Sequence, residues 1–100
     1  MNKPAILAIG TAAPPRSITQ DQAREIACSL EPDKDRHRVI RALYRRAGVR
    51  RRGSVLCDKR GEIDFYAGGQ PTTAERMACY VEHAAVLARR AAAEALENAA

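Results

Sequence analysis

Arginine is the residue type in this sequence with the clearest chemical use. Residues 36–60 hold ten basic side chains and a single acidic one, Asp58, which gives the segment a net charge of +9. The whole chain of 100 residues carries only +5. Such a cationic block indicates an anionic partner: phosphate, nucleic acid, an anionic membrane surface or an acidic protein. The alternative is a solvent-exposed, arginine-rich helix face that binds no partner.

Three arginines of this block are spaced to share one side of a helix. Arg38, Arg41 and Arg45 stand at positions i, i+3 and i+7, which span about one-sixth of the circumference of an ideal helix. Guanidinium groups suit phosphate oxygens, with which they form paired hydrogen bonds. The spacing predicts a cationic stripe opposite the apolar face of the helix. We interpret the run Arg50–Arg52 differently, as charges that block pairing at a strand edge.

The cysteines do not form a recognisable catalytic or metal-binding pattern. Cys28, Cys57 and Cys79 are widely spaced and include no C-x-x-C pair, which predicts neither a zinc site nor a disulfide framework. Core packing is the expected role of Cys28 and Cys79. Asp58 beside Cys57 would raise the pKa of that thiol and make it a poor nucleophile.

The histidines are equally isolated. His37 and His83 have no Cys, Asp or Glu three or four residues later in the sequence. We expect both histidines to be solvent-exposed or to cap a helix. We therefore predict no catalytic residue and no metal site within residues 1–100.

Strands and loops account for a small set of segments. Residues 4–9 form an apolar run ended by Gly10, the pattern of a strand buried on both faces. Residues 49–56 are typical of a polar strand edge or an extended connector. Residues 11–16, with two adjacent prolines, and the glycine-rich residues 57–71 are expected loops.

Two helices are predicted between these segments. The first opens at Thr19 as the N-cap and ends near residue 31. The second starts at Asp33 or Asp35 and stops before Gly48. Its apolar positions are predicted to share one buried face: Val39, Ile40, Leu43, Tyr44 and Ala47.

A third predicted helix is long and rich in alanine. Thr72 and Glu75 form a capping box that opens it, and an apolar stripe continues at helical spacing to the end of the sequence. Alanine buries little area, and a lone strand leaves its backbone groups unpaired. We therefore expect residues 1–100 to be the opening segment of a larger α/β domain.

Composition excludes several classes of protein. With 46% hydrophobic and 29% charged residues, the chain resembles neither a disordered, a collagen-like nor a disulfide-scaffold protein. The apolar run before Gly10 is too short for a signal peptide core, and no later run is long enough to span a bilayer. A cytoplasmic location is the expected default.

Five stretches, taken in order, carry a family resemblance. They are Ala5-Ile6-Leu7-Ala8-Ile9-Gly10-Thr11-Ala12-x-Pro14-Pro15, Ile18-Thr19-Gln20, Tyr44-Arg45-Arg46-Ala47-Gly48-Val49-Arg50-Arg51-Arg52, Ser54-Val55-Leu56 and Pro71-Thr72-Thr73-Ala74-Glu75-Arg76-Met77. Together they resemble the start of the type III polyketide synthases, the chalcone synthase-like enzymes of the thiolase superfamily, in their bacterial form. The likeness covers nearly the whole chain and includes no catalytic motif.

The resemblance implies an α/β fold, the N-terminal part of the layered α-β-α-β-α thiolase-like arrangement, mostly helical in this segment with one or two strands. It implies an acyltransferase that loads an acyl group from coenzyme A onto a cysteine and extends it by decarboxylative Claisen condensation with malonyl-CoA. The Cys-His-Asn set of that family lies beyond the matched region. The implied partners are acyl-CoA, malonyl-CoA and a second copy in a homodimer. No cofactor, nucleic acid or membrane partner is implied.

The family also implies binding residues within the cationic block. It holds the phosphates of coenzyme A with a basic triad spaced Lys-x-x-Arg-x-x-x-Lys, which Arg38, Arg41 and Arg45 reproduce. An alignment without a gap instead puts Arg46 on the last basic position and apolar residues on the other two. We expect Arg45 and Arg46 first, and Arg38 and Arg41 second, to bind these phosphates.

Two other functions stay open at this point. A ketoacyl-carrier-protein synthase III-like enzyme would use Arg46 similarly, but such enzymes carry an aromatic residue where this chain has Ala42. A small basic module that binds nucleic acid through residues 36–60 would explain the charge. That segment lacks helix-turn-helix spacing and offers only Tyr44 for stacking on bases.

Overall fold

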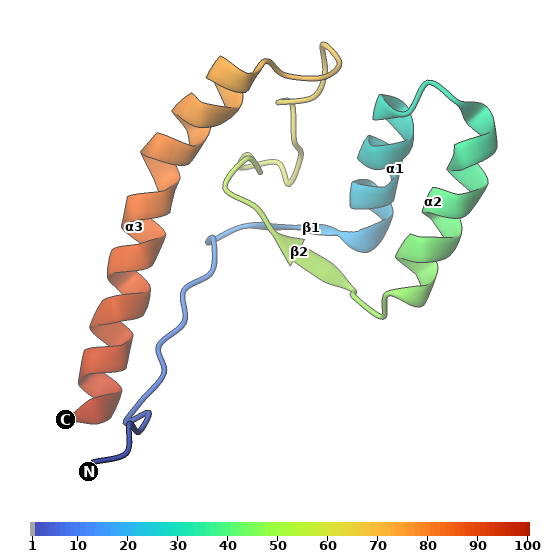
Figure 1. Ribbon diagram of the computed structural model, residues 1–100. Coiled ribbons are helices and arrows are strands. Elements are labelled where there is room, and N and C mark those ends of the chain that lie inside the picture. Colours follow the sequence, from blue (N-terminus) through green and yellow to red (C-terminus); the bar gives the residue numbers. More distant parts are fainter. Residues whose placement is uncertain (1) are drawn as a thin grey trace.

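A computed structural model describes residues 2–100 as a mixed α/β arrangement, mostly helical, with one small antiparallel sheet (Figure 1). Its elements follow in the order β1 (Ser17–Thr19), α1 (Gln20–Leu30), α2 (Lys34–Arg46), β2 (Arg51–Gly53) and α3 (Thr73–Ala99). The predicted loops at 11–16 and 57–71 are confirmed as segments without helix or strand.

Local capping fixes where the helices begin, as predicted. The Thr19 hydroxyl oxygen accepts a hydrogen bond from the Gln22 N–H at 3.1 Å, and the Gln22 side chain accepts one from the Thr19 N–H at 2.8 Å. The Asp33 side chain caps α2, and Thr72 with Glu75 forms the predicted capping box at α3. Each cap satisfies N–H groups that have no partner within the helix.

The sheet pairs two three-residue strands in the register Ser17↔Gly53, Ile18↔Arg52 and Thr19↔Arg51. The strand-like character of residues 49–56 is thus confirmed for its central residues. The expectation that arginines block pairing there is wrong, because Arg51 and Arg52 lie within the paired strand β2 and the Arg51 side chain bonds β1. Arg51 donates from Nε to the Ser17 hydroxyl at 2.7 Å and from Nη2 to the Ser17 carbonyl at 2.9 Å.

Residues 4–9 do not form the predicted strand. They run as extended coil with Ile6 and Leu7 exposed by 82% and 84%. A strand needs a neighbour to satisfy its backbone groups, and in the described chain the only strands, β1 and β2, pair with each other. The apolar run therefore stays uncovered among residues 2–100.

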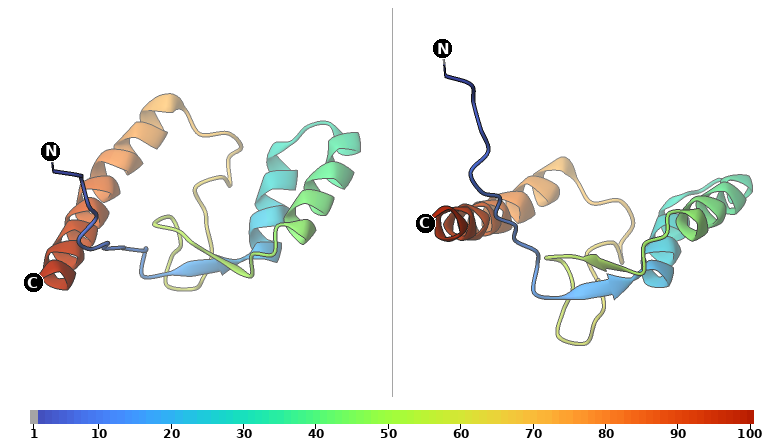
Figure 2. Two further views of the ribbon diagram at one scale, coloured as in Figure 1. Left: turned by 60° about the horizontal axis from the view of Figure 1, so that its bottom comes forward. Right: turned by 90° about the horizontal axis from the view of Figure 1, so that it is seen from below.

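The coil is held instead against the C-terminal half of α3 (Figures 1 and 2). The Asn98 side-chain amide donates to the Ile9 carbonyl at 3.0 Å, and the Thr11 N–H donates to the Glu94 carboxylate at 3.3 Å. A Cβ atom at Gly10 would collide with the backbone of Ala91 and Ala95. Glycine at position 10 is therefore what allows the close approach.

The core of the described chain is small and lies where α1 meets the sheet. Ile18, Ala23 and Cys57 are buried there, with Ile26, Tyr44 and Ile63 packed against them. The predicted single buried face of α2 is only partly right. Val39 and Leu43 are exposed by 58% and 63%, because the side of α2 that meets α1 is the side of Tyr44.

The molecule is extended rather than compact. Its radius of gyration is 17.7 Å, against about 13 Å expected for a compact domain of this length. It exposes 8168 Å², where a compact protein of this mass exposes about 5,600 Å². Figure 2 shows α3 set apart from the pair α1 and α2. None of the helices within residues 2–100 has the length and hydrophobicity to cross a membrane.

Candidate anion-binding site

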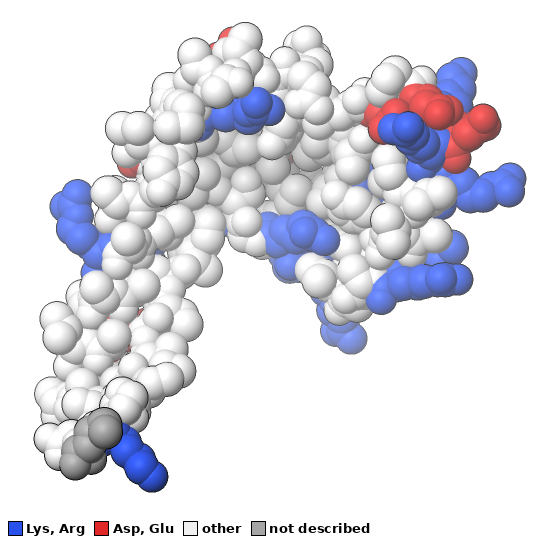
Figure 3. Space-filling model, in the orientation of Figure 1, with Lys and Arg blue, Asp and Glu red and all other residues white. Residues whose placement is uncertain are grey.

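The charge of the cationic block is unevenly compensated in the structure. Arg36 lies 3.8 Å from the Glu31 carboxylate and 3.7 Å from that of Asp33. Arg60 pairs with three carboxylates, as described below. By contrast, the ion pairs among residues 2–100 include none of the four predicted binding residues: Arg38, Arg41, Arg45 and Arg46. Four arginines of α2 therefore carry positive charge that these ion pairs do not compensate. Figure 3 shows Lys and Arg over that end of the molecule, together with a patch of Asp and Glu.

Two of these arginines meet α1 across a groove. Arg41 and Arg45 are one helical turn apart and line a hollow of about 250 Å³ between the two helices. The full lining is Gln20, Asp21, Arg24, Arg41, Tyr44 and Arg45. Three arginines and one aspartate are thus among the lining residues, and their net positive charge favours an anion nearby.

Arg24 is the member of this group that the sequence did not single out. It follows Asp21 by one turn of α1, and its Nη1 atom lies 3.3 Å from the Asp21 carboxylate. An i, i+3 pair of opposite charge is ordinarily a surface pair of little consequence. Arg24 lines the same groove as Arg41 and Arg45 only because α1 packs on α2. No local sequence pattern could therefore identify Arg24 as part of this site.

The four predicted binding residues do not all line the groove. Arg41 and Arg45 share the groove, while Arg38 and Arg46 do not line it. Arg38 stands about 10 Å from Arg45 along the helix axis, at 1.5 Å per residue. Arg46 points about 100° around the helix from Arg45. All four side chains are exposed.

A buried glutamine fixes the last turn of α2. Gln20 is 9% exposed, and its side-chain Nε2 donates to the Tyr44 carbonyl at 2.9 Å. Its Oε1 accepts a hydrogen bond from Arg52 Nε at 2.6 Å, and the Arg52 guanidinium lies 5.2 Å from the centre of the Tyr44 ring. This network joins α1, α2 and β2 at the turn that carries Arg45 and Arg46.

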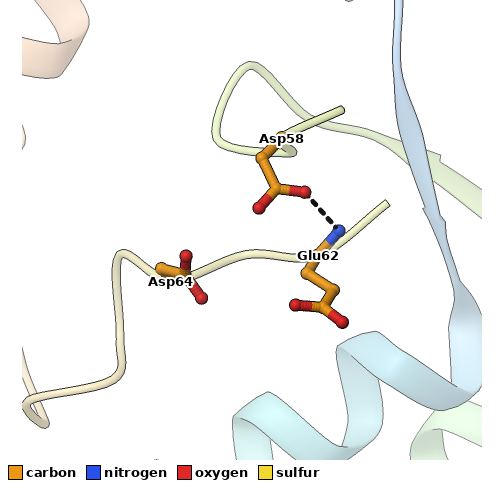
Figure 4. Close-up of side chains that lie close together, drawn as sticks. All are labelled: Asp58, Glu62 and Asp64. Atoms are coloured by element: carbon orange, nitrogen blue, oxygen red, sulfur yellow. Dashed lines mark hydrogen bonds between the residues drawn. The ribbon is translucent and has the colours of Figure 1, made fainter. Parts of the chain in front are cut away.

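A second cluster of charge lies in the loop after β2. The carboxylates of Asp58, Glu62 and Asp64 come within 4.8 Å of one another (Figure 4). Arg60 Nη2 lies 3.0, 3.4 and 3.2 Å from them. The Glu62 N–H and the Arg60 guanidinium, both bonded to Asp58, lower the pKa of its carboxyl group, and Asp58 raises the pKa of Arg60. The cluster thus holds Arg60 in an ion-pair network.

The cysteines are free thiols with structural surroundings. Cys57 is buried, and its Sγ lies 3.7 Å from the Ser17 carbonyl oxygen. The core therefore contains Cys57, whereas Cys28 and Cys79, for which core packing was expected, are half-buried.

The histidines differ in their contacts. The capping role predicted for histidine is confirmed at His37, whose Nε2 donates to the Glu31 carbonyl at 2.8 Å. His83 Nε2 lies 3.6 Å from the carboxylate of its neighbour Glu82.

The chemistry that the arginines of this site support best is the binding of an anion between α1 and α2. No protein-family model, curated protein or solved structure matches the chain.

Proposed function

We propose that the chain is the N-terminal part of a type III polyketide synthase-like acyltransferase in which α2 helps to bind coenzyme A thioesters. The observation that carries the proposal is the set of four arginines on α2 without acidic partners among residues 2–100. The sequence resemblance implies that α2 corresponds to the phosphate-binding helix of that family. Coenzyme A carries a diphosphate and a 3′-phosphate, which match such a surface in charge.

In this proposal, the role of the helix is binding and not chemistry. The enzyme loads the acyl group of an acyl-CoA onto a cysteine, and malonyl-CoA then loses carbon dioxide and condenses with that acyl group. The nucleophile belongs to the part of the family that this chain does not match. A charge-assisted hydrogen bond contributes roughly 1.5–3 kcal/mol when shielded from water and less when exposed. The arginines of α2 therefore hold the substrate so that its thioester reaches the cysteine.

The uncovered apolar surface supports the same proposal. Most of its large residues lie on three segments that the small core leaves bare: Ile6, Leu7 and Ile9, Val39 and Leu43, and Met77, Tyr80, Val81, Val86 and Leu96. The chain exposes about 2,600 Å² more total surface than a compact protein of its mass, and one partner of a standard protein interface buries roughly 800 Å². We propose that these faces pack within the layers of a thiolase-like domain, in a homodimeric enzyme of the cytoplasm.

Nucleic-acid binding receives less support from the same surface. Tyr44 is the single aromatic residue of residues 36–60. Its ring is half-buried and has the guanidinium of Arg52 over it at 5.2 Å. A ring in this position is not free to stack on a base.

The test compares two thioesters in the full-length protein. The variant Arg45→Ala/Arg46→Ala should raise the KM for malonyl-CoA about tenfold, because it removes charge-assisted contacts to phosphate. Its KM for malonyl-N-acetylcysteamine, which lacks phosphates, should stay as in the wild type. Arg89→Ala/Arg90→Ala on α3 removes the same charge elsewhere and should change neither value. An unaltered KM for malonyl-CoA in the α2 variant would show that the phosphates bind elsewhere.

A further inference from the structure

An apolar pocket lies between the loop after β2 and the first turns of α3, apart from the arginines of α2 (Figure 1). Its volume is about 390 Å³. Its lining is mostly apolar and includes Val55, Leu56, Phe65, Tyr66 and Tyr80. We propose that this pocket binds a small aromatic carboxylate, with the ring among the apolar side chains and the carboxylate on Arg76. The proposal does not depend on the binding of coenzyme A by α2.

Local contacts hold the sheet side of the pocket in place. Pro14 packs against the end of β2, where a Cβ atom added to Gly53 would lie 3.2 Å from Pro14 Cδ. The turn after β2 is closed by a hydrogen bond of 3.1 Å from the Leu56 N–H to the Ser54 hydroxyl oxygen. All four residues line the pocket, so these contacts fix the part of its wall that follows the sheet.

Three aromatic rings give the pocket its preference for a flat apolar group. Phe65 and Tyr66 meet edge to face, with ring centres 5.3 Å apart and an angle of 88° between the ring planes. Both are half-buried, whereas Tyr80 on α3 is 65% exposed. Aromatic rings favour edge-to-face and offset-stacked neighbours. A further ring among these side chains therefore gains such contacts in addition to the burial of its apolar surface.

Arg76 is the one charged residue that the described chain provides to the lining. It precedes Cys79 and Tyr80 by about one helical turn, at the spacing i, i+3 and i+4. Residues at this spacing share one face of a helix, so α3 presents a guanidinium group, a thiol and a phenol ring to the same pocket.

The guanidinium group of Arg76 has no carboxylate partner among the ion pairs of residues 2–100. Its Nη2 atom donates to the Thr73 hydroxyl oxygen at 3.3 Å. Glu75, its neighbour in sequence, instead accepts from the Thr72 N–H at 3.2 Å in the capping box. A guanidinium group matches a carboxylate in charge and can donate two parallel hydrogen bonds to it. The pocket therefore fits an apolar ligand with one negative charge.

The volume of the pocket and its single charge define the class of ligand. Pockets that hold a whole small molecule measure about 300–1,000 Å³. At about 390 Å³ this pocket lies near the lower end of that range, which suits one ring or two fused rings. An exposed ion pair contributes little by itself, so burial of the ring provides most of the affinity and the carboxylate provides the specificity.

Calorimetric titration of the full-length protein tests this site, with 2-naphthoate as the probe and 2-naphthalenemethanol as its neutral counterpart. Arg76→Ala should weaken the binding of 2-naphthoate about fivefold and leave that of 2-naphthalenemethanol unchanged, because only the ion pair is lost. Tyr80→Ala removes apolar surface and should weaken the binding of both probes. Arg90→Ala, also on α3 but outside the lining, is the control for loss of charge alone.

Cys79 reports where the probe binds. Its thiol is half-buried and lines the pocket, whereas Cys28 lies on α1 outside the lining. Saturating 2-naphthoate should slow the alkylation of Cys79 by N-ethylmaleimide several-fold and leave that of Cys28 unchanged. Peptide mass spectrometry measures the two rates separately.

Alkylation of Cys79 at the same rate with and without 2-naphthoate would overturn the proposal. A Cys79 that does not react in the free protein would overturn it as well, because another segment would then fill the pocket. Equal affinity of the wild type and Arg76→Ala for 2-naphthoate would contradict the role of the carboxylate. Arg76 is exposed and alanine favours helices, so this variant keeps its fold.

Discussion

The side-chain amide of Gln20 donates a hydrogen bond of 2.9 Å to the main-chain carbonyl of Tyr44, and so ties the first turn of α1 to the last turn of α2. The same side chain accepts from Arg52 at 2.6 Å. One buried residue therefore sets the spacing of the two walls of the groove and the position of the turn that carries Arg45 and Arg46.

Substitution of Gln20 should loosen this junction. Gln20→Leu fills a similar volume but leaves the Tyr44 carbonyl and the Arg52 guanidinium without their partner. The expected cost is about 1–3 kcal/mol in the free energy of unfolding, since a buried polar group loses its hydrogen bond. Hydrogen exchange in the last turn of α2 should speed up accordingly. Gln70→Leu, in an exposed loop, is the matched control, and equal exchange in both variants would refute the role of Gln20.

Gly10 should tolerate no side chain. Gly10→Ala places a Cβ atom against the backbone of Ala91 and Ala95, which cannot move as a flexible side chain does. We expect a cost of about 1–3 kcal/mol from overpacking, and residues 9–11 should separate from α3. Limited proteolysis within residues 2–16 reports this separation. Gly68→Ala meets no atom within 4 Å and should leave the cleavage rate unchanged. Equal protection in the two variants would contradict the contact.

Asp58 should give the loop after β2 a dependence on pH. The pKa of its carboxyl group is lowered from 3.8 by the Glu62 N–H and by Arg60. The ionised form is therefore favoured in the folded loop, so its contribution to stability is complete above pH 3.8 and is lost as the pH falls through the lower native value.

An NMR titration of the Asp58 carboxyl carbon measures this pKa. Hydrogen exchange of the Glu62 amide should accelerate over the same acidic range. Asp58→Asn keeps an oxygen that accepts from Glu62 but cannot titrate, so its exchange should lack this pH-dependent step. A midpoint at or above 3.8 in the wild type would refute the shift.

Features that depend on neighbours in sequence were predictable. Thr19 with Gln22, and Thr72 with Glu75, are three residues apart, and each pair placed the start of a helix correctly. For α2 the sequence left two possible starts, Asp33 and Asp35, and the structure has Asp33 as the N-cap. A capping hydrogen bond forms between residues that are already close, so its signature survives in a single sequence.

Features that depend on distant packing were not predictable. Ser17 pairs with Gly53, although α1 and α2 lie between them in the sequence. Nothing local in Ser17–Thr19 indicates a strand. The apolar pattern of residues 4–9 indicates a segment that favours burial, but it does not identify the element that would cover this segment. In the site, the arginine spacing identified Arg41 and Arg45, whereas Arg24 required the packing of α1 on α2.

The contact between residues 9–11 and α3 also determines the order in which the chain acquires its structure. The hydrogen bonds of this contact close loops of 83 and 89 residues, whereas the bond from Gln20 to Tyr44 closes one of 24. Short loops close with less entropic cost, so α1, α2 and the β1–β2 pair form early during synthesis. The apolar residues 5–9 are synthesised before α3, so their contact with α3 forms only after α3 has been made. Ile6 and Leu7 also stay exposed in the described structure, so this apolar run is open to pairing with other chains and prone to aggregation.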